Sequence, residues 1–183
     1  MQFNPAQRVL TLKVVYYGPA LSGKTTNLRG LHAAVDEQHR GRLSTLDTAD
    51  DRTLFCDLMP IFMTTSSGVR VKIQAATVPG QVMHNLTRRI VLQGADAIAF
   101  IADAQPSQRL ANFDYWRNMA ENLRENAMRV EDVPIVIQFN KCDLIDPTMR
   151  AEIDEMRRSA REPIFEAVAI AAPHRSRRAS WGR

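Results

Sequence analysis

Eight consecutive residues near the N-terminus, Gly18 to Thr25, have the types and spacing of a phosphate-binding loop. They read GPALSGKT, which fits the pattern G-x-x-x-x-G-K-[ST]. Glycines let the backbone curl with its N–H groups pointing inward, and a following helix N-terminus adds positive potential. We therefore predict that Lys24 reaches the outer phosphates of a nucleotide and that Thr25 ligates Mg²⁺. The expected nucleotide contacts of this loop are Gly18, Ala20, Leu21, Ser22, Gly23, Lys24, Thr25 and Thr26.

A second motif, Asn140-Lys141-Cys142-Asp143, directly follows the apolar run 133–139. This position is the carboxyl end of an expected strand, where open α/β sheets bind their ligands. A carboxylate such as that of Asp143 can accept two hydrogen bonds from the N1–H and amino group of guanine, a pair that adenine does not offer. Asn140 would hold the loop and the base, and the stem of Lys141 would cover the ring face. Four residues alone are a weak match, but their place beside a phosphate loop favours a guanine nucleotide.

Strands and helices alternate along the chain, and this order predicts an α/β domain with a doubly wound, mostly parallel sheet. Residues 39–58 are polar and weakly patterned, so we expect a loop there. The turn at 66–68 predicts one antiparallel hairpin. Strands are expected at 9–17, 59–65, 69–78, 97–102, 133–139 and 165–170, and helices at 25–38, 107–128 and 147–161.

Length and composition are those of a single globular domain, since the chain has 183 residues, 45% hydrophobic and 24% charged. No apolar run reaches the length of about 18 residues needed to span a membrane, and neither end carries a lipidation motif, so we expect no stable membrane anchor. The net charge of +4 is concentrated in the last ten residues, so composition gives no reason to expect nucleic-acid binding. That charge comes from Arg175, Arg177, Arg178 and Arg183.

Five segments of the sequence resemble the Ras-like small GTPases, and within them the bacterial MglA family of cell-polarity and gliding GTPases. They are VVYYGPALSGKTTNL (14–28), ADDRTLFCDLMP (49–60), TVPGQV (77–82), QFNKCDL (138–144) and FEAVA (165–169). The motif TVPGQ is specific to this family, because most small GTPases have aspartate at the position of Thr77. The resemblance reaches about Ala171 and implies a P-loop NTPase of Ras-like fold, a small GTPase domain over 1–172 and a basic, disordered tail over 173–183.

The resemblance also implies roles for individual residues. Thr53 resembles the threonine of the first switch, which senses Mg²⁺ and the γ-phosphate. Gly80 resembles the glycine of the second switch that contacts the γ-phosphate, and Gln81 the residue that orients the attacking water. Arg52 resembles an arginine finger supplied in cis, although without the resemblance it would be taken for a solvated loop charge. Ala169 corresponds to the loop that backs the guanine.

The function implied is a cytoplasmic switch that binds GTP and GDP, hydrolyses GTP and can be recruited to a cell pole. The implied partners are a roadblock-fold activating protein, MglB-like, and downstream polarity or motility effectors. Two features depart from the family. Ala20 stands where glycine is usual, and its methyl is expected to face the γ-phosphate side. The end, AAPHRSRRASWGR, replaces the closing amphipathic helix, so we expect that helix to be missing or altered.

Two alternatives stay open. Ala20 favours a nucleotide-locked interaction module with negligible turnover, whereas Arg52 and Gln81 favour a GTPase. A P-loop kinase acting on a small metabolite would leave the motif at 140–143 unexplained. Asp57 and Asp103 stand at the ends of expected elements, and we expect them to cap an element or to be solvated.

Overall fold

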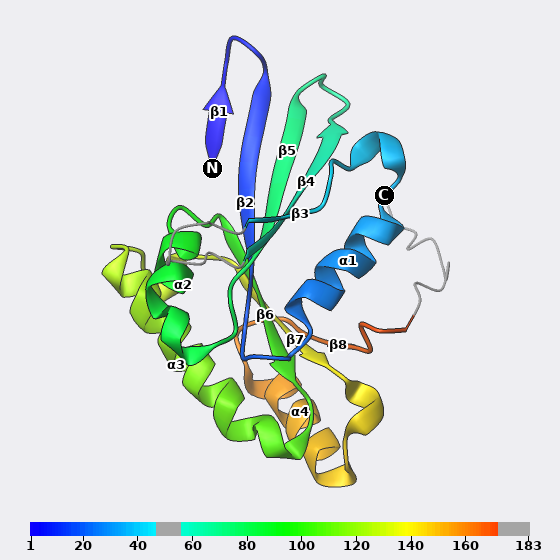
Figure 1. Cartoon of the computed structure of the whole chain (residues 1–183), viewed down its shortest axis with the longest axis vertical. Helices are drawn as coiled ribbons and strands as arrows, with labels where there is room; N and C mark the ends of the chain where they lie inside the picture. Colours follow the sequence, from blue (N-terminus) through cyan, green and yellow to red (C-terminus); the bar gives the residue numbers. More distant parts are fainter. Residues whose placement is uncertain (47–55, 172–183) are drawn as a thin grey trace.

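The computed structural model describes residues 1–46 and 56–171, and its centre is one mixed sheet in the strand order β3-β4-β5-β2-β6-β7-β8, with β1 beside β2 (Figure 1). The strands are β1 (Gln2–Asn4), β2 (Val9–Tyr17), β3 (Ser44–Leu46), β4 (Cys56–Thr64), β5 (Arg70–Thr77), β6 (Ala97–Asp103), β7 (Ile135–Asn140) and β8 (Ile164–Ala167). Strands β5, β2, β6, β7 and β8 run parallel. Strands β1 and β4 run antiparallel to them, and β3 pairs antiparallel with β4 at the edge of the sheet. The carboxyl ends of the parallel strands therefore meet at one edge.

Helices cover both faces of the sheet (Figure 1). They are α1 (Lys24–Ala34), α2 (Asn85–Leu92), α3 (Arg109–Glu125) and α4 (Pro147–Ser159). Local sequence sets their ends. Helix α4, for example, starts where the carboxylate of Asp146 accepts the N–H of Met149 at 2.7 Å and Pro147 fills the first turn. None of the described helices is both long enough and apolar enough to cross a membrane.

Two hydrophobic cores lie on opposite faces of the sheet, because alternate residues of each strand point to opposite sides. The larger core packs α2, α3 and α4 against the sheet, and the smaller one packs α1 against β4 and β5. Buried members of the larger core include Val15, Ile98, Phe100, Leu92, Met119 and Ile153. The smaller core is built on Leu28, Met59, Ile61 and Ala75. This two-sided covering is the doubly wound arrangement expected from the sequence.

The predicted elements are confirmed with small changes of boundary. The predicted hairpin is β4 and β5, and the first predicted helix ends at Ala34, short of the expected residue 38. Among the described strands and α-helices, three were not anticipated: β1, β3 and α2. Residues 39–58 are thus not all loop, because Ser44–Leu46 pairs with the start of β4. The expected tail at 173–183 and the altered last helix lie outside the described residues.

Candidate functional site

The loop between β2 and α1 has a backbone that only glycine fits at two positions. Gly18 has φ of 144°, and a Cβ there would lie 2.2 Å from the carbonyl oxygen of Ile101. Gly23 has φ of 96°, and its Cβ would lie 2.2 Å from Asn140 Nδ2. Positive φ strains side-chain-bearing residues, and no room exists for a methyl. Both glycines of the motif are therefore needed for the loop to lie against the ends of β6 and β7.

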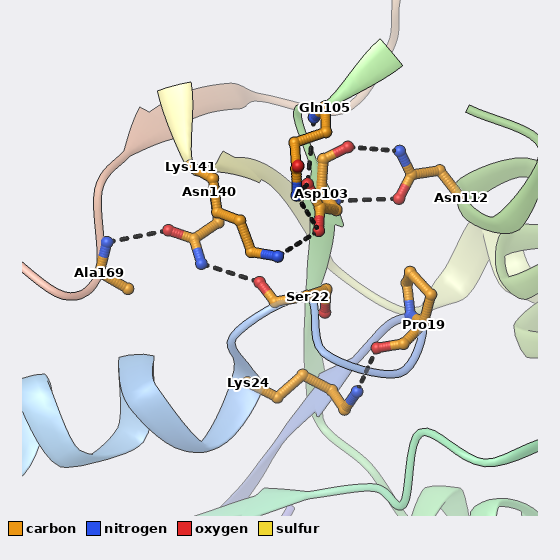
Figure 2. Close-up of polar contacts among 9 residues, drawn as sticks. All are labelled: Pro19, Ser22, Lys24, Asp103, Gln105, Asn112, Asn140, Lys141 and Ala169. Carbon is orange, nitrogen blue, oxygen red and sulfur yellow. Dashed lines mark hydrogen bonds and ion pairs between the residues drawn. The ribbon is translucent and has the colours of Figure 1, made fainter. Parts of the chain in front are cut away.

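Asn140 connects three segments that are far apart in the sequence (Figure 2). Its Nδ2 donates to the carbonyl of Ser22 at 2.8 Å, and its Oδ1 accepts the N–H of Ala169 at 2.9 Å. Asn140 is buried, so these bonds fix the loop against its neighbours in a setting without competing water. The phosphate loop, the motif at 140–143 and the loop after β8 are thereby brought to one edge of the sheet. Asp143 lies at this edge with its side chain exposed.

Lys141 pairs with Asp103 beside this connection (Figure 2). Its Nζ lies 2.5 Å from Asp103 Oδ2, and Asp103 is only 2% exposed. Asp103 accepts the backbone N–H of Gln105 at 3.0 Å, while the amide of Asn112 bonds to the backbone of Asp103. The expectation that Asp103 caps an element or is solvated is therefore wrong, because the residue is buried and holds both a local turn and an ion pair. Lys141 adopts φ of 66°, which turns its side chain back to the end of β6.

Lys24 lies buried within the phosphate loop. Its Nζ donates to the carbonyls of Gly18 at 2.9 Å and Pro19 at 2.6 Å. Burial, followed by the nearby positive charge of Arg88, lowers the pKa of Lys24 to about 8. The ammonium group is thus costly to keep charged here, and an anion placed beside it would stabilise it.

Asp57 is a site residue that the sequence prediction did not recognise. It is 9% exposed, and its Oδ2 accepts the hydroxyl of Thr25 at 2.6 Å. Its Oδ1 accepts the hydroxyl of Thr45 at 2.8 Å, and its N–H donates to Thr77 Oγ1 at 2.9 Å. The register of the hairpin gave the only available signal, because counting back from the turn places Asp57 opposite Thr77. Hydroxyl and carboxylate oxygens are the ligands that Mg²⁺ prefers, so Thr25 and Asp57 fit that ion.

A cavity of about 740 Å³ lies over the phosphate loop. Its walls include Ala20, Lys24, Thr25, Asp57, Gly80 and Gln81. Gly80 packs closely on the loop, since a Cβ on it would lie 2.5 Å from Ala20 Cα and 2.9 Å from Lys24 Nζ. The side chain of Gln81 is exposed and its Oε1 lies 3.1 Å from His84 Nε2. Ala20 thus lines the same cavity as Gly80 and Gln81.

Comparison with known proteins agrees with this arrangement. No protein-family model matches the chain. The chain is 37% identical over 169 residues to the mutual gliding-motility protein MglA of Myxococcus xanthus (strain DK1622), covering 91% of this chain and 85% of that protein. It belongs to the MglA family. The chain is accordingly a small GTPase of Ras-like P-loop fold, and membership implies the use of guanine nucleotide and Mg²⁺.

Most residues predicted for this MglA-family site come together at one sheet edge. Residues 18–26 surround the start of α1, Gly80 and Gln81 line the cavity beside them, and Asn140, Lys141 and Ala169 lie on the other side of the loop. Arg52 and Thr53 fall outside the described residues. Their predicted roles remain predictions.

Proposed function

We propose that this chain is a guanine-nucleotide switch that binds GTP and GDP, hydrolyses GTP to GDP and phosphate, and regulates cell polarity and gliding motility. The observation that carries the proposal is the double hydrogen bond of Asn140, which joins the phosphate loop at Ser22 to the loop at Ala169. A site that reads both phosphates and a base needs these segments fixed relative to one another. Kinship with the gliding-motility protein MglA supports the cellular role.

On the base side, Asp143 would accept hydrogen bonds from guanine, and the exposed position of its carboxylate at the sheet edge supports this role. Asn140 and Ala169 would form the wall behind the base. The stem of Lys141 would cover the ring, with its charge neutralised by Asp103. An adenine base would leave the acceptors of Asp143 without donors, so GTP and GDP would be favoured over ATP and ADP.

On the phosphate side, Lys24 and the backbone N–H groups of the phosphate loop would hold the outer phosphates. Thr25 would hold Mg²⁺ together with Thr53, and the buried carboxylate of Asp57 lies where it can support the ion. Mg²⁺, when bound, neutralises charge on the β- and γ-phosphates. Gly80 would approach the γ-phosphate through its backbone.

For hydrolysis, Gln81 would orient the attacking water and Arg52 would neutralise the charge that develops on the transferred phosphoryl group. A second candidate is a nucleotide-locked module with negligible turnover, favoured because Ala20 stands in the wall of the cavity where the family has glycine. Single-turnover hydrolysis with and without the activating partner separates the two, because the locked module hydrolyses GTP in neither condition.

The remaining assignments follow from the same resemblance. The activating partner would be an MglB-like protein of roadblock fold, and the GTP state would be read by polarity or motility effectors. The switch would work in the cytoplasm, with recruitment to a pole. Its functional unit would be residues 1–172, with 173–183 as a basic tail.

The base assignment is tested with Asp143→Asn. The new amide offers an N–H to a base carbonyl, so preference should move from GTP to xanthosine triphosphate by at least about 10²-fold. Asp154→Asn, at a partly exposed acid of α4, is the matched control and should keep the GTP preference. Competition binding with both nucleotides measures the change. An unchanged preference in Asp143→Asn would remove the guanine assignment.

A further inference from the structure

Two successive carbonyls in the loop after β5 are held from outside the cavity. The hydroxyl of Tyr115, on α3, donates to the carbonyl of Gly80 at 2.7 Å. Nη1 of Arg88, on α2, donates to the carbonyl of Gln81 at 2.5 Å. The proposed function assigns γ-phosphate contact to Gly80 and water orientation to Gln81, so any role of these two donors in the site rests on that function.

Arg88 is itself held in several directions. It is 3% exposed, and its Nε donates to Asn118 Oδ1 at 2.9 Å. Its Nη2 lies 3.3 Å from Asn85 Oδ1, and its guanidinium carbon lies 5.2 Å from the centre of the Tyr115 ring. A planar group with contacts at three of its nitrogens and over an aromatic ring cannot turn without losing several of them. Arg88 is therefore a rigid donor to the loop.

The same polar network reaches the strand that leads into the phosphate loop. Tyr17, the last residue of β2, is fully buried and donates its hydroxyl to Asn118 Oδ1 at 2.7 Å. Asn122 donates to the hydroxyl of Tyr17 at 3.1 Å and to Asn85 Oδ1 at 3.0 Å. Tyr115 and Arg88 together form a clamp on the loop after β5. Arg88 and the start of the phosphate loop are thus anchored to the same side chains of α2 and α3.

The orientation of the peptide group between Gly80 and Gln81 indicates what this clamp does. No cis peptide occurs in the described residues, so the carbonyl of Gly80 and the N–H of Gln81 point in opposite directions. The carbonyl points to Tyr115, and a Cβ built on Gly80 would lie 2.5 Å from Ala20 Cα and 2.9 Å from Lys24 Nζ, so Gly80 lies between α3 and the phosphate loop. We infer that Tyr115 and Arg88 are positioning residues. Tyr115 holds the Gly80–Gln81 peptide and Arg88 holds the next one, Gln81–Val82, so that the N–H of Gln81 is directed to the terminal phosphate of a nucleoside triphosphate.

This role predicts discrimination between nucleotides. A donor aimed at the terminal phosphate contributes to the binding of a triphosphate and contributes nothing to a diphosphate. Loss of the clamp should therefore lower the affinity for the triphosphate alone. A merely structural hydroxyl, by contrast, would change protein stability without changing the ratio of the two affinities.

The test compares Tyr115→Phe with Tyr17→Phe. Each variant removes one hydroxyl from the same network, but only the hydroxyl of Tyr115 donates to the loop after β5. Affinities for GDP and for a non-hydrolysable GTP analogue are measured by fluorescence, together with Tm. We expect Tyr115→Phe to weaken the analogue about 10- to 150-fold, as for loss of a hydrogen bond to a charged group, and to leave GDP within about twofold. Tyr17→Phe should lower Tm and keep the wild-type ratio.

Two results would overturn the inference. An unchanged affinity ratio in Tyr115→Phe overturns it, as does an equal loss of the ratio in Tyr17→Phe. In both cases the wild-type protein still binds guanine nucleotide, so the proposed function stands. If the wild-type protein binds neither nucleotide, the proposed function fails and the inference fails with it.

Discussion

The two halves of the site are built differently. On the base side, formed by Ser22, Asn140, Lys141, Ala169 and Asp103, the protein groups bond to one another through contacts that a ligand can leave intact. On the phosphate side, formed by Ala20, Lys24, Thr25, Asp57 and Gly80, groups with ligand-binding chemistry are engaged with other protein groups.

Because of this difference, we expect the base side to set the affinity for guanine nucleotides in general and the phosphate side to distinguish GTP from GDP. A preformed base side contributes equally to GTP and GDP, because both carry the same base. On the phosphate side, Lys24 must exchange its two carbonyl partners for phosphate, and Thr25 must share its hydroxyl with a metal. Such exchanges depend on how many phosphates are present, so this side can distinguish the two nucleotides. Substitutions confined to one side test that division.

Removal of the Lys24 charge should have the largest effect. In Lys24→Met the phosphates lose a buried cation, and charged hydrogen bonds of about 1.5–3 kcal/mol each predict a loss of about 10²–10⁴-fold in nucleotide affinity. The same change should raise Tm, because it removes an ammonium group that burial disfavours. Lys72→Met, on β5, is the control and should retain affinity. A fall in Tm for Lys24→Met would show that its bonds to the two carbonyls outweigh the cost of burial.

Replacement of Ala20 should change the rate of hydrolysis and barely change binding. Gly80 lies against the backbone of Ala20 in the wall of the cavity, and we expect removal of the methyl in Ala20→Gly to free space for the transition state. Relief of one displaced contact corresponds to about 10- to 10³-fold in rate. Single-turnover GTP hydrolysis at saturating Mg²⁺ and partner measures this, with affinity expected to stay within about twofold. Equal rates would mean that the methyl does not obstruct catalysis.

The lowered pKa of Lys24 predicts a pH dependence of the phosphate side. Phosphate binds the charged ammonium, so nucleotide affinity should fall as pH rises above about 8, by up to about tenfold per unit. Between pH 8 and 10.5 the unfolded chain binds more protons at this residue than the folded one, so this group's contribution to stability increases with pH. Titration of affinity from pH 7 to 10 checks the first point. Lys24→Arg, which does not titrate in this range, should lack the slope.

A change on the base side should be smaller and equal for both nucleotides. Asp103→Asn removes the charge that holds Lys141, and we expect GTP and GDP to weaken together by about 3- to 10-fold, in line with a partly exposed ion pair. Asp114→Asn, an exposed acid of α3, is the control. Binding of both nucleotides to each variant is measured side by side. A selective loss of GTP would contradict the division between the two sides.

The sequence was sufficient for those parts of the fold whose signal is local. Apolar runs and the glycines at 18 and 23 placed the parallel strands and the phosphate loop, because buried strands and positive φ leave direct marks in sequence. The three exposed residues of β1 carry no such mark, and β3 is fixed by its pairing with β4 rather than by its own residues. Helix α2 has only eight residues, which is too short for a helical pattern of apolar residues to stand out in the sequence.

The candidate site was predictable where a motif defines it and not where long-range pairing does. Asn140 and Lys24 belong to recognisable motifs. Asp57 and Asp103 act through Thr25 and Lys141, which lie 32 and 38 positions away, so only the folded chain brings each acid to its partner. The network of Tyr115 and Arg88 has the same origin, since α2 and α3 must first pack together.

The two bonds of Asn140 also have a consequence for the folding pathway. The bond to Ser22 closes a loop of 118 residues, and the bond to Ala169 adds the last strand, so the base side is completed only after β2, β7 and β8 have assembled. Contacts of such long sequence separation form slowly, because loop-closure entropy must be overcome first. Guanine nucleotide would therefore meet its full binding site only on a nearly complete chain, and its presence during refolding would selectively stabilise molecules that have already reached the native state.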